Sequence, residues 1–354
     1  ARMIMAGLEW RGKVPFKNVY FTGIVRDKQR RKMSKSLGNS PDPLELIDKY
    51  GADSVRVGIL LSSAAGNDLL FDEDLMLQGR NFATKIYNAF KLTQSWTKEA
   101  KPAGEAEKQT IVWFENQMNK TISEINDQFE KFRISDALHL LYKLIWDDFC
   151  SWYLEAVKPN FGESISQEVY DQTIKFFEEL MRLLHPFMPF LTEELYQHIA
   201  ERNTSEALVI AQQKNAESFD ENTISAFDTA KEIISGVRNY RQSKGISPRE
   251  EVALFTSESS FANENVIRKL ANISEIHYSE KTDKPSFTFL VGAVEISVPL
   301  SENLDLGEEK KKTEEELAYL KGFLVSVEKK LSNEKFVANA KPEIVENERK
   351  KQKD

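Results

Sequence analysis

A short basic segment is the part of the chain whose residue types are best suited to chemistry. Between residues 26 and 35 it sets six cations against the single acid Asp27. The whole chain has a net charge of −8, so a nucleic-acid partner must be met by local positive surface of this kind. Ammonium groups, serine hydroxyls and backbone N–H groups can all donate hydrogen bonds to phosphate oxygens. The segment predicts either a phosphate-binding loop or a solvated basic turn; its cations are Arg26, Lys28, Arg30, Arg31, Lys32 and Lys35.

Elements on both sides must hold this segment in place. The β-branched and aromatic residues at 19–25 predict a buried strand before it. Turn-forming residues at 38–41 end the loop. Asp42 and Pro43 then have the residue types of a helix N-cap and first turn. A second short apolar helix is expected at 52–61, so the loop would lie between a strand and two helices.

Helical spacing of apolar residues dominates the middle of the chain. Four such sets predict amphipathic helices joined by polar links. Helices of this kind pack as a bundle, which we place at residues 72–205. The sets lie at 82–93, 122–132, 138–153 and 174–184.

After the bundle the pattern changes twice. Residues 206–307 are expected to form a small mixed α/β piece, with a helix at 224–242 followed by strands at 252–256, 287–291 and 294–298. From residue 308 to 354 the composition is rich in Lys and Glu, and apolar residues repeat at intervals of 3 and 4, which predicts a coiled coil. Its seam is Leu317, Leu320, Leu324, Val327 and Leu331.

Both ends of the sequence look interrupted. The apolar run at residues 1–8 has the pattern of a helix already under way, so we expect the chain to begin inside a domain. Pro342 could open a return helix, but the remainder after it is shorter than the preceding arm. The coiled coil is therefore expected to be truncated.

A family resemblance rests on residues 32–39, which read KMSKSLGN. This run is similar to the KMSKS signature of class I aminoacyl-tRNA synthetases, where it also follows a strand and precedes two short helices. The runs at 146–153 and 184–190 resemble the anticodon-binding bundle of that family. The resemblance implies a mainly α chain. It would begin with the C-terminal remnant of a Rossmann-like α/β catalytic domain at residues 1–71 and continue into an anticodon-binding bundle at 72–205.

The resemblance also implies a reaction. In this family an amino-acid carboxylate attacks the α-phosphate of ATP, and lysines on a mobile loop stabilise the charge that builds on the departing pyrophosphate. It assigns Lys32 and Lys35 to catalysis, and both of them with Ser34 and Ser36 to the ATP phosphates. ATP would be a substrate accompanied by Mg²⁺, with no permanently bound cofactor and no protein metal site. Arg30 stands where many relatives carry glycine.

Two segments are similar to the valyl group of the family, namely residues 66–71 and the charged stretch that includes 330–336. Isoleucyl enzymes often end in a cysteine-bound zinc module, and Cys150 is the one cysteine here. We therefore expect part of the enzyme that joins valine to tRNA(Val). A HIGH motif, an amino-acid pocket and an editing domain do not occur in this sequence, so the chain alone is expected neither to activate valine nor to edit. Three alternatives stay open: an isoleucyl fragment, a non-catalytic tRNA-binding protein, and a scaffold acting through its coiled coil.

Contacts with tRNA are expected from a cluster of cations near the end of the 224–242 helix and from one aromatic residue. The cations also suit the helix dipole, and aromatic residues at helical spacing are often core, so both alternatives stay open. The single cysteine favours a reducing compartment, and no apolar run is long enough to span a bilayer. We expect a cytoplasmic monomer. The expected tRNA contacts are Arg238, Arg241, Lys244, Arg249 and Trp152.

Overall fold

The computed structural model describes residues 1–63, 66–203, 205–300, 318, 321–329 and 331–332. These residues fall into two compact units. The first holds the described residues within 1–281 and 288–296, and the second holds those within 282–287 and 297–354. Most of the predicted coiled coil lies outside the described residues, including Leu317, Leu320 and Pro342, although the chain is helical at 321–329. None of the described helices is long and apolar enough to cross a membrane.

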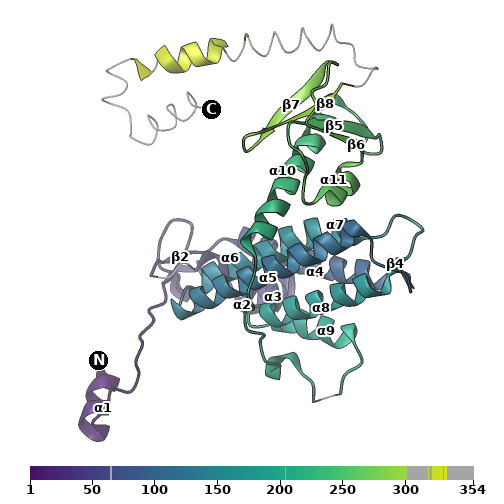
Figure 1. The fold of residues 1–354 in the computed structure, drawn as a ribbon. Coiled ribbons are helices and arrows are strands. Elements are labelled where there is room, and N and C mark those ends of the chain that lie inside the picture. Colours follow the sequence, from purple (N-terminus) through teal and green to yellow (C-terminus); the bar gives the residue numbers. More distant parts are fainter. Residues whose placement is uncertain (64–65, 204, 301–317, 319–320, 330, 333–354) are drawn as a thin grey trace. The chain divides into compact units, whose positions relative to one another are not determined.

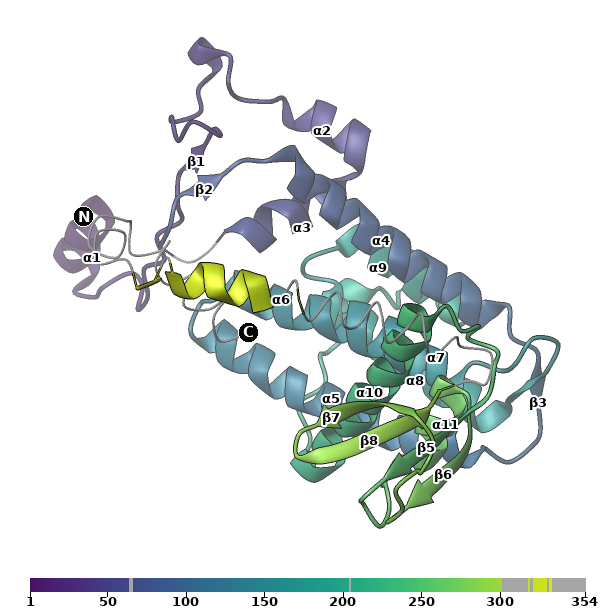
Figure 2. The ribbon, with the colours of Figure 1, turned by 90° about the horizontal axis from the view of Figure 1, so that it is seen from above.

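The segment before the basic loop contains less regular structure than the sequence predicted. Helix α1 (Arg2–Arg11) buries none of its residues. The predicted strand at 19–25 is reduced to β1 (Val25–Arg26), which pairs in parallel with β2 (Leu69–Leu70) (Figure 2). Its β-branched and aromatic residues are exposed instead of buried, with Phe21 at 79%. The prediction of a buried strand there is wrong, because β2 is only two residues long and reaches no further than Val25.

Two short helices follow the loop, as predicted. The Asp42 carboxylate accepts a hydrogen bond of 2.8 Å from the Leu44 N–H and so caps α2 (Pro43–Tyr50). Helix α3 (Ala52–Ser62) then packs closely on α4 (Glu73–Gln94). Glycine is needed at this crossing, since a Cβ on Gly79 would stand 2.4 Å from the Ser54 carbonyl oxygen. The close contact fixes the loop-bearing segment against the next helix.

The predicted helical bundle is present. Its helices run alongside one another (Figure 1) and enclose an aromatic core. Trp113, Phe114, Phe149, Tyr153 and Phe177 are each at most 1% exposed. The helices after α4 are α5 (Glu105–Glu130), α6 (Ile134–Lys143), the π-helical η2 (Leu144–Tyr153), α7 (Leu154–Val157), α8 (Gln167–Leu184) and α9 (Pro189–Ile199). Two short strands, β3 (Lys98–Glu99) and β4 (Ile165–Ser166), pair at one end.

A set of polar contacts connects α3 to α9 and to the turn before it. The Asp53 carboxylate accepts hydrogen bonds from the N–H groups of Phe190 (3.4 Å) and Leu191 (2.7 Å), which belong to the first turn of α9. The Arg56 guanidinium donates to the carbonyl oxygens of Pro186 and Phe187 at 2.9 and 3.2 Å. The loop-bearing segment and the bundle are therefore joined by charged hydrogen bonds to backbone atoms.

Removing the Asp53 side chain should weaken this connection. We expect Asp53→Ala to lower the free energy of unfolding by about 2–3 kcal/mol, because two N–H groups would lose a charged acceptor. Urea unfolding measures the change. Asp48→Ala is the matched control, since Asp48 is an exposed carboxylate on neighbouring α2 and should change stability by less than about 0.5 kcal/mol. Equal effects of the two substitutions would contradict a structural role for Asp53.

Beyond the bundle, α10 (Glu221–Lys244) leads to a small sheet with strand order β6-β5-β8-β7. The predicted helix at 224–242 and the three predicted strands are confirmed as α10, β5 (Val252–Thr256), β7 (Ser286–Val291) and β8 (Val294–Pro299). The sequence did not predict α11 (Glu264–Ala271) or β6 (Ile273–Tyr278), which pairs in parallel with β5. A short 3₁₀ turn, η3 (Leu208–Ile210), lies on α9 before α10 begins.

Candidate functional site

The basic segment folds as a tight hairpin. Arg26 and Lys32 form an antiparallel bridge, and the Met33 N–H donates to the Val25 carbonyl oxygen. The turn closes with a 2.8 Å hydrogen bond from the Arg30 N–H to the Asp27 carbonyl oxygen. Arg30 has φ +63°, a left-handed conformation that costs an L-residue about 1–2 kcal/mol and suits glycine. Glycine at this position would avoid that cost.

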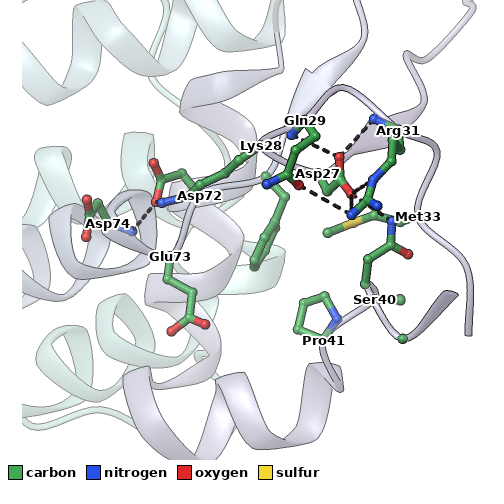
Figure 3. Close-up of a pocket in the computed structure, with 13 residues that line it drawn as sticks. Asp27, Lys28, Gln29, Arg31, Met33, Ser40, Pro41, Asp72, Glu73 and Asp74 are labelled. Atoms are coloured by element: carbon green, nitrogen blue, oxygen red, sulfur yellow. Dashed lines mark hydrogen bonds and ion pairs between the residues drawn. The ribbon is translucent and has the colours of Figure 1, made fainter.

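The Asp27 side chain is the centre of the hairpin (Figure 3). It is 7% exposed and accepts hydrogen bonds from the N–H groups of Gln29 (3.0 Å) and Arg31 (2.8 Å). The Arg31 guanidinium donates to it at 2.7 Å, and the Asn39 amide donates to it at 2.9 Å. A single carboxylate thus connects the turn to the far end of the loop. Sequence reasoning missed both Asp27 and Asn39 as parts of the site.

These hydrogen bonds stabilise the ionised form of Asp27. The amide donor of Asn39, and after it Arg31, outweigh partial burial and lower the pKa of Asp27 to about 2. A carboxyl group whose pKa is lowered in the folded state stabilises that state above its unfolded pKa, and the stabilisation is lost as the pH falls through the folded value.

We therefore expect the Asp27 carboxylate to stay ionised, and its hydrogen bonds to persist, from neutral pH down to about pH 3. A ¹³C NMR titration of the carboxyl carbon tests this, with Asp27→Asn identifying the signal. A midpoint near the ordinary value of 3.8 would show that these hydrogen bonds do not form in solution.

The loop itself ends in a single 3₁₀ turn, η1 (Lys35–Leu37). The Ser34 hydroxyl caps this turn by accepting from the Leu37 N–H, and it lies 3.2 Å from the Ser36 hydroxyl. Gly38 ends the turn at φ +65°, where glycine avoids the cost that a Cβ would bring. Lys35 therefore projects from a short capped turn and not from an extended tail.

The cations of the hairpin divide into paired and unpaired groups. Among the described residues, Lys32, Lys35 and Arg30 form no ion pair, and all three are exposed. The other cations are neutralised: Arg26 by Asp68 at 2.5 Å, Lys28 by Asp72 at 3.1 Å and Arg31 by Asp27 at 2.7 Å. Both lysines of the KMSKS run are thus left available to an anionic ligand.

An open pocket of about 510 Å³ lies between the hairpin and the start of α4 (Figure 3). Apolar groups of Met33, Pro41 and Phe71 line it together with Asp72 and its neighbours. Lys32 and Lys35 are not among the lining residues. The pocket therefore adjoins the paired cations Lys28 and Arg31 and not the two lysines of the KMSKS run.

The residues that were expected to contact tRNA differ in their exposure. The Arg241 side chain is 4% exposed, and its guanidinium donates to the carbonyl oxygens of Ala271 (2.6 Å), Glu250 (2.6 Å) and Asn272 (3.1 Å). It connects α10 to the turn between α11 and β6, so we do not retain it as a phosphate contact. Its position near a helix end gave no sign of this burial.

The remaining expected contacts lie at the surface of α10 and beside it. The Arg238 guanidinium lies 5.5 Å from the Trp152 ring and donates to the Leu270 carbonyl oxygen at 3.3 Å. Trp152 is half-buried, Lys244 lies in the last turn of α10, and Arg249 is exposed in the turn that follows. Arg238 and Trp152 are thus brought together, whereas Arg249 lies on a separate segment.

Other polar residues of the bundle have structural partners. The His185 Nδ1 atom lies 2.8 Å from the Thr192 hydroxyl, consistent with a satisfied interior histidine. Asp148 is 4% exposed and pairs with the Lys231 ammonium at 2.9 Å. The neighbouring aromatic residues Tyr153 and Phe149 belong to the core of the bundle. Within the described part of the chain, no group of three acidic, histidine or cysteine side chains could hold a metal ion.

Three family models match the chain. Residues 1–72 match the model described as tRNA synthetases class I (I, L, M and V), and residues 112–256 match the anticodon-binding domain of tRNA ligase. Residues 305–354 match the valyl tRNA synthetase tRNA binding arm. Together with the KMSKS hairpin and the helical bundle, these matches show that the chain belongs to the class I aminoacyl-tRNA synthetases.

Within that class the chain groups with the valine–tRNA ligases. It is 52% identical over 358 residues to the valine–tRNA ligase of Christiangramia forsetii and 50% identical to that of Parabacteroides distasonis. Each alignment covers 100% of this chain and 41% of the relative, so the chain spans less than half the length of the curated relatives that it matches. The isoleucyl alternative is not favoured. A solved LeuRS–tRNA–LeuAMS complex from Agrobacterium radiobacter K84 aligns with 63% of this chain and with 27% of the solved protein chain, at 22% sequence identity. Its TM-score of 0.44 is too low to bear on the fold.

Proposed function

We propose that this chain is the part of a valine–tRNA ligase that supplies the KMSKS hairpin and the tRNA-binding helices. The whole enzyme would activate valine with ATP and transfer it to tRNA(Val). The single observation that supports this best is the division of charge in the hairpin. Lys32 and Lys35 are free of ion pairs among the described residues, while Arg26, Lys28 and Arg31 are neutralised. A loop arranged in this way presents its lysines to an anion.

The proposed chemistry follows from that presentation. A valine carboxylate oxygen attacks the α-phosphorus of Mg²⁺-bound ATP, and the bond from that phosphorus to the β-bridging oxygen breaks. Negative charge then accumulates on the departing pyrophosphate. The ammonium groups of Lys35 and Lys32, with the hydroxyls of Ser34 and Ser36, stabilise this charge more in the transition state than in bound ATP.

Binding of tRNA is proposed for the bundle and the pieces that follow it. We retain the predicted boundaries, with the catalytic part at 1–71, the anticodon-binding bundle at 72–205, the mixed piece at 206–307 and the arm at 308–354. Arg238, Lys244 and Arg249 would contact phosphates, and Trp152, held beside Arg238, would contact a base or sugar. We propose that the protein acts in the cytoplasm, because its tRNA substrate is used in that compartment. We also propose that it is a monomer.

The test of tRNA recognition uses the chain itself. Fluorescence anisotropy with tRNA(Val) and tRNA(Ile) between about 50 and 200 mM salt should show tighter binding of tRNA(Val) by at least about tenfold. Replacing Arg238, Lys244 and Arg249 together by alanine should reduce the slope of log K against log salt by about 2–3. Equal affinity for the two tRNAs would contradict the proposal, and an unchanged slope would remove the three cations from the interface.

A further inference from the structure

We propose that Asp27 and Asn39 are positioning residues for the proposed activation reaction. Through a bridge of side-chain hydrogen bonds, here called the Asp27–Asn39 bridge, they hold the hairpin and its 3₁₀ turn in one arrangement. The bridge fixes the segment between Lys32 and Lys35, so that both ammonium groups stay directed at the same anion. This inference rests on the proposed function and adds residues that do not themselves touch the substrate.

The contacts form a continuous path across the loop. Asp27 receives the turn N–H groups and the Arg31 guanidinium. The Asn39 Nδ2 atom donates to Asp27 at 2.9 Å, and the Asn39 Oδ1 atom accepts from the Ser34 N–H at 2.9 Å. Ser34 in turn caps η1 with its hydroxyl. Ser34, which lies between the two motif lysines, is thereby connected through the side chains of Asn39 and Asp27 to the turn of the hairpin.

The residue types suit these two positions, and exchanging either residue alone would not preserve the hydrogen bonds of the bridge. An asparagine has both a donor and an acceptor, whereas an ionised aspartate has acceptors only. Asn39 uses its donor toward Asp27 and its acceptor toward Ser34. An aspartate at position 39 would place two carboxylates in contact, and an asparagine at position 27 would offer fewer acceptors to Arg31. The pair is therefore expected to behave as one unit.

Pre-arrangement of this kind affects rate more than binding. Donors already held where charge develops need no reorganisation during the reaction. A loop freed from the bridge would still carry Lys32 and Lys35, but it would spend less time in the arrangement in which both reach the pyrophosphate. Loss of the bridge should thus lower kcat while leaving the KM for valine unchanged.

The first test needs no catalysis. In Asn39→Ala the Ser34 N–H loses its acceptor, so hydrogen exchange in the peptide that contains Ser34 should accelerate by about tenfold. The matched control is Asp72→Asn, which removes an ion pair to Lys28 beside the same hairpin and keeps a good helix cap. Its Ser34 peptide should exchange at the rate of the unchanged chain. Equal exchange in Asn39→Ala and the unchanged chain would overturn the bridge.

The second test measures reaction rate in a chimera in which this chain replaces the matching 41% of the Christiangramia forsetii valine–tRNA ligase. Asp27→Asn and Asn39→Asp should each lower kcat for valine-dependent pyrophosphate exchange by about tenfold or more. The double exchange Asp27→Asn/Asn39→Asp restores one donor and one acceptor, so it should be at least about tenfold faster than the product of the single effects predicts.

The outcomes separate the two proposals. Single variants as fast as an active unsubstituted chimera, or a double variant no faster than the product of the singles, would overturn the positioning role. A shift in the KM for valine in place of kcat would also contradict it. An unsubstituted chimera that folds without exchange activity would count against the proposed function, and hydrogen exchange at Ser34 would then decide the bridge by itself.

Discussion

Lys35→Met in the chimera is expected to lower kcat for valine-dependent pyrophosphate exchange by about 10²–10³-fold, the effect of removing one donor from a developing oxyanion. The KM for valine should hardly change, because the ammonium group acts on the leaving pyrophosphate. Lys32→Met is expected to have the same direction of effect. Lys35 is exposed and without an ion pair among the described residues, so its loss leaves no buried carboxylate behind.

Lys28→Met is the matched control for this prediction. Lys28 lies on the same hairpin, but its ammonium group pairs with Asp72, which also raises the pKa of Lys28. Its substitution should change kcat by less than about threefold. Similar losses in Lys28→Met and Lys35→Met would indicate a general effect of positive charge, and a loss below about threefold in Lys35→Met would remove it from catalysis.

The second large effect is expected in the bundle. Lys231→Met should lower the free energy of unfolding by about 3–5 kcal/mol, because it leaves the buried Asp148 carboxylate without its partner. The Lys231 ammonium lies 2.9 Å from Asp148 and 4.4 Å from the centre of the Trp113 ring. Burial raises the pKa of Asp148. The loss of stability should therefore become smaller as the pH is lowered, because the unpaired carboxyl can then bind a proton.

Urea unfolding of the chain measures this change, and a second variant separates charge from packing. Lys231→Met/Asp148→Leu replaces both partners by apolar groups and should recover most of the lost stability. Loss of the same size in the double variant would mean that packing against Trp113 matters more than the ion pair. A single variant within about 1 kcal/mol of the unchanged chain would contradict a structural role for the pair.

The sequence was sufficient for features that depend on neighbours in the chain. The helices of the bundle could be predicted because apolar residues recur with the helical period over many turns. The N-cap Asp42 and the glycine after the KMSKS run were readable for the same reason, since caps and turns involve residues a few positions apart. The motif itself was recognisable because eight consecutive residues carry it.

Features that depend on distant partners were not predictable. Residues 19–25 have strand-forming side chains, but strand formation requires a partner, and the structure pairs only Val25–Arg26 with Leu69–Leu70. Helix α11 and strand β6 are short, and two of the three carbonyl groups that accept from the buried Arg241 belong to Ala271, at the end of α11, and Asn272, just before β6. Without them Arg241 looked like an exposed cation at a helix end.

The Asp27–Asn39 bridge is intermediate between features set by neighbours in the chain and features set by distant partners. Its two residues are 12 positions apart, further than any local turn rule reaches. In the sequence Asp27 appeared only as the single acid among six cations. The structure shows that this acid neutralises Arg31 and organises the hairpin, which leaves the motif lysines free. The paired and unpaired groups of cations could be told apart only once these contacts were known.

The most direct test of the account is valine-dependent pyrophosphate exchange by the unsubstituted chimera. If this chain supplies a working KMSKS hairpin, the chimera should exchange pyrophosphate at a rate within about tenfold of the Christiangramia forsetii enzyme. A chimera that is folded and binds tRNA(Val), yet exchanges no pyrophosphate above the background without valine, would contradict the claim that Lys32 and Lys35 of this chain act on ATP.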